Sequence, residues 1–212
     1  MNYYSRYAKI RELCTNKVVL DIGCAMHRKY EEAIRDGRWI HEIIREVAKK
    51  VVGIDYLQDQ VEFLNRKGYE VYHVNAEKLE DLKLEQKFDV IVAGELIEHL
   101  SNPGLFLEGA KRFLNDDGIL IITTPNCFAY HRFKLLLNNV TENKWLNKEH
   151  TQWYSFYTLQ QLLERHGYKP EDYSYYDDNN NNNIKVKVKK FLNYNKVNIS
   201  HFADGLFFIA KL

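Results

Sequence analysis

KVVLDIGCA, residues 17–25, is a short apolar run that ends in small residues. Unbroken apolar runs of this length, closed by a chain breaker, are typical of strands buried on both faces of a parallel sheet. Runs of the same kind follow as VVGID at 51–55, YEVYHVNA at 69–76, FDVIVAG at 88–94 and GILIITTP at 118–125. The sequence therefore predicts a series of buried parallel strands.

Amphipathic stretches separate these runs. We expect helices at 2–14, 38–50, 57–67 and 103–114, with Gly68 ending the third and a turn at 115–118 after the fourth. Strands that alternate with helices give right-handed crossovers and a parallel sheet covered by helices on both faces. The fold class is therefore doubly wound α/β, in which ligands bind beyond the carboxyl ends of the strands.

The chain length of 212 residues favours one domain over 1–212. We expect an N-terminal helix in 1–16, a core in 17–125, an aromatic-rich insertion or lid in 126–157, and a C-terminal helix and strands in 158–212. In the last part, Thr158 is the expected N-cap of a helix that Gly167 ends, and 168–177 and 205–212 are expected strands. Asn179 to Asn183 indicates a surface loop, and 184–191 an ordinary surface element.

Composition excludes several classes of protein. Lys and Arg number 30 against 29 Asp and Glu, a net charge of +1, so the basic excess of a nucleic-acid-binding protein is absent. The three cysteines form no CxxC pair, which argues against a zinc site or a disulfide framework. No apolar run approaches the roughly 18 residues of a membrane span. We therefore expect a soluble cytoplasmic protein with no nucleic-acid or membrane partner.

Small or polar residues stand directly after each predicted strand. Gly23 and Ala25 follow the first, but Ala25 and Arg28 replace the later glycines of G-x-G-x-x-G, which argues against a nicotinamide or flavin cofactor. Asp55 ends the second strand, where its carboxylate can accept both hydroxyls of a ribose or cap a helix. Asn75 ends the third and can bind an adenine amino group or cap a helix.

The densest polar group follows the fourth strand, in GELIEHL at 94–100. If this segment is helical, Glu95 and His99 lie on one face with Glu98 beside them. Two carboxylates and an imidazole suit a general base with an orienting partner, or a metal site with oxygen and nitrogen ligands. A polar capping turn is the structural alternative.

VVLDIGC, VVGID, NAE, FDVIVAGELIEHL and NPGLFLEGAKRFLNDDGILIITTPN together resemble, in order and spacing, the motifs of class I S-adenosylmethionine-dependent methyltransferases. The resemblance is closest to small-molecule enzymes of the type 11 and type 23 groups, which include ubiquinone-type O-methyltransferases. It covers residues 17–126, and HTQWYS at 150–155 resembles the segment after their fifth strand. It implies a mostly parallel seven-stranded sheet and the transfer of a methyl group from S-adenosylmethionine to a small-molecule acceptor.

The resemblance also implies roles for individual residues. The cofactor-binding residues would be Asp21, Gly23 and Ala25 at the methionine moiety, Asp55 at the ribose, Tyr56, Asn75, Ala76 and Glu77 at the adenine, and Gly94 and Glu95 near the sulfonium. His99 is the expected general base and His150 the alternative base, and Glu95 is expected to be a further catalytic residue. Glu95, Glu98 and His99 also match the Glu-x-x-Glu-His segment that ubiquinone-type relatives use for a divalent cation, so base and metal ligand both stay open.

The acceptor is expected to contact Glu98 together with Tyr130, Trp153 and Tyr154 of the aromatic-rich insertion. The insertion also contains Trp145. Aromatic faces suit a hydroxyl of a saccharide or secondary metabolite, although each ring can equally pack the insertion onto the sheet. One alternative is a non-catalytic binding module. Another is an RNA or protein methyltransferase; the neutral charge disfavours RNA as the substrate. Either a monomer or a homodimer is expected.

Overall fold

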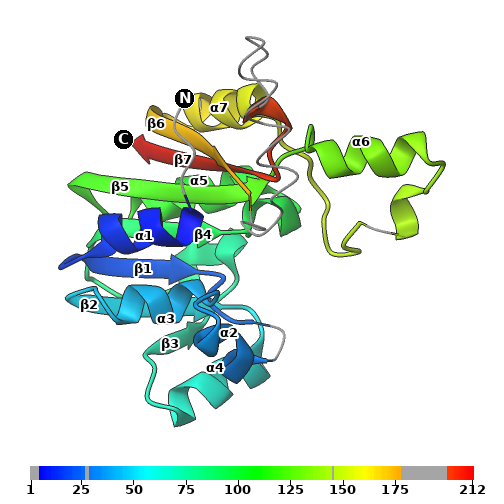
Figure 1. The fold of residues 1–212 in the computed structure, drawn as a ribbon. Helices are drawn as coiled ribbons and strands as arrows, with labels where there is room; N and C mark the ends of the chain where they lie inside the picture. The colour runs from blue at the N-terminus through cyan, green and yellow to red at the C-terminus, as the bar shows by residue number, and fades with distance from the viewer. Residues whose placement is uncertain (1–4, 27–28, 145, 178–199) are drawn as a thin grey trace.

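The computed structural model describes residues 5–26, 29–144, 146–177 and 200–212 (Figure 1). Its seven-stranded sheet has the order β3-β2-β1-β4-β5-β7-β6. The strands are β1 Val18–Ile22, β2 Lys50–Asp55, β3 Val71–His73, β4 Phe88–Gly94, β5 Leu114–Pro125, β6 Lys169–Tyr176 and β7 Gly205–Lys211. β1 to β5 pair in parallel, and β7 runs antiparallel to both β5 and β6. The doubly wound, mostly parallel seven-stranded sheet that was expected is confirmed.

Helices cover both faces of this sheet. They are α1 Arg6–Cys14, α2 Tyr30–Arg35, α3 Ile40–Arg45, α4 Gln58–Arg66, α5 Pro103–Lys111, α6 Tyr130–Leu137 and α7 Phe156–Arg165, with 3-10 turns η1 Ala76–Asp81, η2 Ile97–His99, η3 Glu142–Lys144 and η4 Ser200–Phe202. Successive strand residues point to opposite faces. Val19 therefore packs with α1 and α3, whereas Leu20 packs with α5 and α7. Among the described residues, no helix has the length and apolar character needed to cross a bilayer.

The start of α7 differs from the expectation. Ser155, not Thr158, is the N-cap, because the Thr158 N–H donates to Ser155 Oγ at 3.2 Å and the Ser155 N–H donates to Thr158 Oγ1 at 2.9 Å. This reciprocal pair is a capping box, so the predicted cap residue was wrong by one helical turn. Gly167 ends the helix as expected, at φ +74°.

The predicted turn at 115–118 was also wrong. Strand β5 begins at Leu114 rather than at Gly118, and its register against β4 shifts between Phe88, opposite Leu114, and Val90, opposite Ile119. Within the irregular segment, Asn115 Nδ2 donates to Asp89 Oδ1 at 2.9 Å. The polar residues that suggested a turn therefore form an irregularity inside a longer strand.

The segment after β5 leaves the sheet at the carboxyl ends of the strands. Figure 1 shows α6 projecting there, apart from the sheet. Asn126 anchors the start of the segment, since it forms a parallel bridge with Tyr154 and its Nδ2 donates to the Ala203 carbonyl at 2.9 Å. Trp145, the asparagine tract 179–183 and segment 184–191 lie outside the described residues.

Candidate active site

A pocket of about 370 Å³ opens at the carboxyl ends of β1, β2, β3 and β4. Of the residues expected to bind a cofactor, those that line it are Gly23, Ala25, Asp55, Tyr56, Asn75, Ala76, Glu77 and Glu95. They come from four different strand ends, which only the parallel order of the sheet brings to one edge. The volume suits a ligand of nucleoside size, since small-molecule pockets span roughly 300–1,000 Å³.

The loop after β1 approaches the pocket through its small residues. Gly23 has φ +77°, and a Cβ at this position would lie 3.0 Å from Leu96 Cδ1. A larger residue would therefore combine backbone strain with a clash. A hydrogen bond also holds the loop, because Trp39 Nε1 donates to the Cys24 carbonyl at 2.8 Å. The buried Trp39 side chain thus fixes the backbone of the loop at Cys24.

Asp55 forms the wall of the pocket at the end of β2. It is only 5% exposed, and its Oδ1 and Oδ2 accept hydrogen bonds from the N–H groups of Leu57 at 3.0 Å and Ala25 at 2.9 Å. Each carboxylate oxygen has two lone pairs, so acceptor capacity remains for a ligand hydroxyl. Asp55 therefore stabilises the turn into α4 and faces the pocket at the same time.

Two of the expected cofactor residues lie off the pocket lining that the described residues form. The buried Asp21 carboxylate points toward α3, with its Oδ2 2.9 Å from His41 Nδ1. Gly94 faces α3, where a Cβ would lie 2.6 Å from Ile40 Cδ1. Both residues thus shape the strand ends through packing and hydrogen bonding.

Asn75 shows the helix-capping arrangement that was considered as an alternative. Its side-chain oxygen accepts a hydrogen bond from the Glu77 N–H at 2.8 Å at the start of η1. The Glu77 carboxylate in turn accepts a hydrogen bond from the Asn102 N–H, which ties η1 to the start of α5. Asn75 and Glu77 nevertheless both remain at the rim of the pocket.

The helical arrangement expected after β4 was wrong. Glu95 has a left-handed backbone with φ +53°, and the following turn is the short η2, so Glu95 and His99 do not share a helix face. The Glu95 carboxylate instead contacts Arg6 Nη1 at 3.0 Å, Thr123 Oγ1 at 3.0 Å and the Tyr176 hydroxyl. Within the described part of the chain, Glu95 is therefore not paired with His99 as the sequence suggested.

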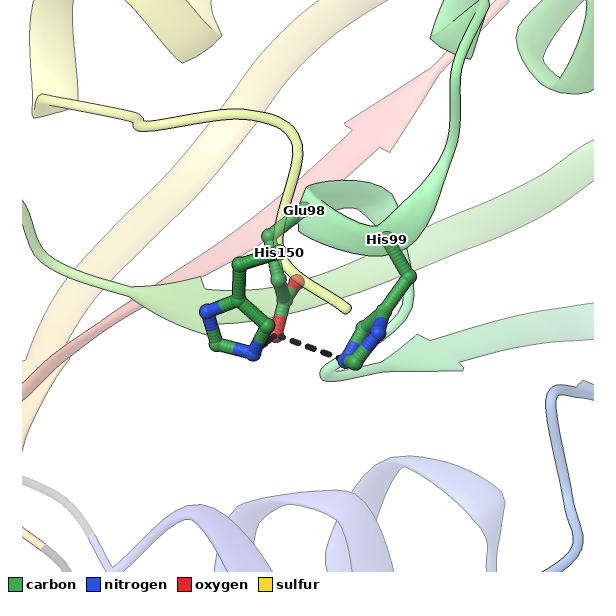
Figure 2. Close-up of side chains that lie close together, drawn as sticks. All are labelled: Glu98, His99 and His150. Atoms are coloured by element: carbon green, nitrogen blue, oxygen red, sulfur yellow. Dashed lines mark ion pairs between the residues drawn. The ribbon is translucent and has the colours of Figure 1, made fainter. Parts of the chain in front are cut away.

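His150 takes the place beside Glu98 that Glu95 was expected to hold. Figure 2 shows the side chains of Glu98, His99 and His150 converging. Glu98 Oε1 lies 3.9 Å from His99 Nε2 and 4.0 Å from His150 Nε2. Among the described residues this oxygen has no hydrogen-bond partner, whereas Oε2 accepts from Thr124 Oγ1 at 2.9 Å.

Burial controls the charge of this cluster. Glu98 is 2% exposed, and burial, reinforced by the negative charge of Glu95, raises the pKa of its carboxyl to about 8. Burial also lowers the pKa of His150, with the charges of His99 and Arg132 adding to the effect. Near neutral pH, the lowered pKa favours the neutral form of His150, which can accept a proton or bind a cation.

The residues expected on the acceptor side lie in different environments. Tyr130, on α6, is 61% exposed, and Trp153 is partly exposed with the Arg132 guanidinium 4.1 Å from its ring centroid. Tyr154 is buried in the core against the sheet, which is the packing role considered for it. Glu149, which was not among the predicted site residues, also lines the pocket, with its Oε2 3.8 Å from His99 Nδ1. Its position beside His150 was the available signal.

The chain matches known proteins over most of its length. A type 23 methyltransferase-domain family model matches residues 3–173. A probable S-adenosylmethionine-dependent methyltransferase of Mycolicibacterium smegmatis is 27% identical over 177 residues, covering 81% of this chain and 61% of that protein. A ubiquinone biosynthesis O-methyltransferase of Haemophilus ducreyi is 29% identical over 119 residues, covering 52% of this chain and 46% of that protein. The chain thus spans about half to three fifths of these curated relatives' lengths.

Solved structures share the fold. The crystal structure of a SAM-dependent methyltransferase from Archaeoglobus fulgidus superposes with a TM-score of 0.66 at 19% identity, over 97% of this chain and 92% of that chain. The strand order of the sheet, the pocket at the strand ends and the family match over residues 3–173 all fit a methyltransferase domain. The chain belongs to the type 23 methyltransferase-domain family and has the Rossmann-like fold of S-adenosylmethionine-dependent methyltransferases.

Proposed function

We propose that the protein transfers a methyl group from S-adenosylmethionine to a hydroxyl oxygen of a small molecule, such as a saccharide or a secondary metabolite. The observation that carries the proposal is the buried Asp55 carboxylate at the pocket wall, tied to the loop after β1 through Ala25. A nucleoside in this pocket would place its ribose hydroxyls at Asp55 and its adenine beside Tyr56 and Ala76. The methionine end would then lie toward Gly23 and Glu95.

Methyl transfer from a sulfonium is a displacement in which the protein mainly aligns donor and acceptor and excludes water. A hydroxyl acceptor must also lose its proton. We assign this step to His99, because it lines the pocket and its ring nitrogens lie 3.9 Å from Glu98 Oε1 and 3.8 Å from Glu149 Oε2. The Glu149 carboxylate would stabilise the imidazolium that forms. His150 is the second candidate base.

The same cluster fits a divalent cation. Potential ligand atoms of Glu98, His99 and His150 all lie within 4.8 Å of one another, and the buried Glu98 Oε1 is without a hydrogen-bond partner in the described part of the chain. A mixed set of imidazole and carboxylate ligands is suited to several divalent transition metals. A cation held there would lower the pKa of an acceptor hydroxyl. Glu95 is not part of this group among the described residues, and its Oε1 is instead held by Arg6, Thr123 and Tyr176.

We place the acceptor beside residues 126–157, on the side of the strand ends where α6 projects (Figure 1). This segment supplies His150 and Glu149 to the site and presents Tyr130 and Trp153 at the surface. The ubiquinone O-methyltransferase name of one relative supports a small hydroxylated acceptor. A cytoplasmic location, a monomeric or homodimeric state, and the absence of nucleic-acid and membrane partners remain predictions from the sequence.

The test is methyl transfer from isotopically labelled S-adenosylmethionine to a panel of catechols, phenols, monosaccharides, amines and RNA, followed by mass spectrometry. We expect label on a hydroxyl oxygen of at least one class. Binding of S-adenosylmethionine and S-adenosylhomocysteine is measured in parallel by calorimetry. If neither compound binds, the proposal is wrong. If both bind and the label appears only on nitrogen acceptors or on RNA, the cofactor assignment stands and the hydroxyl acceptor is wrong.

A further inference from the structure

Glu95 adopts an unusual backbone conformation at the end of β4. Its φ of +53° lies in the left-handed region, which non-glycine residues rarely adopt and keep only where the surroundings impose it. The Glu95 N–H donates to the Thr123 carbonyl at 2.9 Å and lies 3.2 Å from Thr123 Oγ1. The neighbouring strand β5 therefore fixes the backbone of this residue.

The Glu95 side chain is held by distant parts of the chain. Its Oε1 atom accepts hydrogen bonds from Thr123 Oγ1 at 3.0 Å and from the Tyr176 hydroxyl on β6, and it forms an ion pair with Arg6 Nη1 on α1 at 3.0 Å. The Arg6 side chain is 11% exposed and its guanidinium lies 5.1 Å from the centroid of the Tyr176 ring. Residues of α1 and β6, which are far apart in the sequence, thus meet at one carboxylate oxygen.

The turn that Glu95 begins forms one wall of the pocket. Leu96 follows directly and packs on the loop after β1, with its Cδ1 3.0 Å from where a Cβ on Gly23 would stand. Glu95, Leu96 and His99 all line the pocket, but of the described residues that line it none belongs to α1 or β6. Arg6 and Tyr176 therefore contact the pocket lining through Glu95.

We propose that Arg6 and Tyr176 are positioning residues, which hold the Glu95 carboxylate and thereby fix the turn that closes the donor pocket against the loop after β1. Charge-assisted hydrogen bonds are the stronger kind, which suits them to hold a strained turn in place. The inference rests on the proposed function, because it assigns this pocket to the methyl donor. It makes the N-terminal helix part of the site although the helix does not touch the pocket.

The experiment compares Arg6→Ala, Arg6→Lys and Tyr176→Phe with Arg11→Ala, a matched control on α1 that removes the exposed pair of Arg11 with Glu46. Calorimetry measures the affinity of each variant for S-adenosylhomocysteine. We expect about tenfold weaker binding for Arg6→Ala, a smaller loss for Tyr176→Phe, and partial recovery in Arg6→Lys, because Lys keeps one charged donor. Arg11→Ala should bind as the wild type does.

Two outcomes overturn the inference: wild-type affinity in both Arg6→Ala and Tyr176→Phe, or an undiminished effect of Arg6→Ala in a Glu95→Gln background. Amide hydrogen exchange of residues 94–100 provides a readout without ligand. Exchange there should be faster in Arg6→Ala and Tyr176→Phe and unchanged in Arg11→Ala. If the wild type binds neither donor nor product, the proposed function fails, and equal exchange in all variants would then separately refute the positioning role.

Discussion

Oδ2 of Asp55 accepts a hydrogen bond from the Ala25 N–H at 2.9 Å, so the end of β2 is tied directly to the loop that follows β1. Asp55 Oδ1 accepts a second one from the Leu57 N–H at 3.0 Å, which fixes the orientation of the carboxylate. A ligand hydroxyl would thus meet an acceptor that is already held in place. Preorganisation of this kind reduces the entropy cost of binding.

Replacing Asp55 should therefore weaken donor binding. Asp55→Ala removes the charged acceptor for the ribose and leaves the Ala25 N–H without its partner, and hydrogen bonds to charged groups contribute about 1.5–3 kcal/mol each. We expect at least tenfold weaker binding of S-adenosylhomocysteine by calorimetry, and a loss in Asp55→Asn as well, because an amide has one acceptor oxygen. Asp59→Ala, an exposed acidic position on α4, is the control and should bind normally. Normal affinity in Asp55→Ala would place the nucleoside elsewhere.

Removing the imidazole of His99 should slow methyl transfer and spare donor binding. General bases contribute roughly 10²–10⁴ in rate, so His99→Ala should reduce kcat by at least about 100-fold with an acceptor found in the panel. The dissociation constant for S-adenosylhomocysteine should change little. His166→Ala, which loses an imidazole paired with Glu108 outside the pocket, is the control. An unchanged kcat in His99→Ala would transfer the role to His150.

Cation binding should depend on Glu98 and not on Glu95. We expect Zn²⁺ or Mn²⁺ titrated into chelator-treated protein to give heat and to raise the melting temperature, because binding to the folded state stabilises it. Glu98→Gln and His150→Ala should abolish both effects. Glu95→Gln should retain them, since the Glu95 carboxylate lies against Arg6 and Tyr176. Loss of binding in Glu95→Gln alone would restore the Glu-x-x-Glu-His ligand set that the sequence suggested.

The raised pKa of Glu98 predicts the sign of a pH effect on stability. In the folded state Glu98 keeps its proton up to a pKa of about 8, whereas in the unfolded chain it loses it near 4.5. The folded state therefore binds more protons between these values, and the free energy of unfolding should fall as pH rises through this window. Urea denaturation of chelator-treated protein should show a flatter dependence in Glu98→Gln. Equal pH dependence in the two proteins would contradict the raised pKa.

The capping box of α7 predicts which of two hydroxyl residues matters for stability. Ser155→Ala removes the N-cap and should lower the free energy of unfolding by about 1 kcal/mol in urea denaturation. Thr158→Ala should cost less, because Ala has the higher helix propensity and offsets the lost reciprocal bond. The reverse ranking would mean that Thr158 is the cap, as the sequence pattern alone had suggested.

Local sequence patterns were sufficient to predict the sheet and the side of the site that Gly23 and Asp55 form. The runs that became β1, β2 and β4 are apolar because both faces of those strands are buried, and that requirement is written into consecutive residues. Asp55 and Gly23 stand at strand ends, so their place at the pocket followed from the parallel order of the strands.

The other side of the site depended on contacts between distant segments. The helical spacing predicted that Glu95 lies beside His99. In the structure the Glu95 carboxylate instead contacts Arg6, Thr123 and Tyr176, and η2 is a single short turn. His150 reached Glu98 because the chain after β5 returns over the strand ends. Neither contact leaves a signal in the spacing of nearby residues.

The sequence by itself therefore determined the succession of the strands and which residues stand at the strand ends, since burial and chain reversal act on neighbouring residues. Only the tertiary structure decided the partners of Glu95 and Glu98, because hydrogen bonds and ion pairs between residues far apart in the chain form after the sheet has brought its edges together.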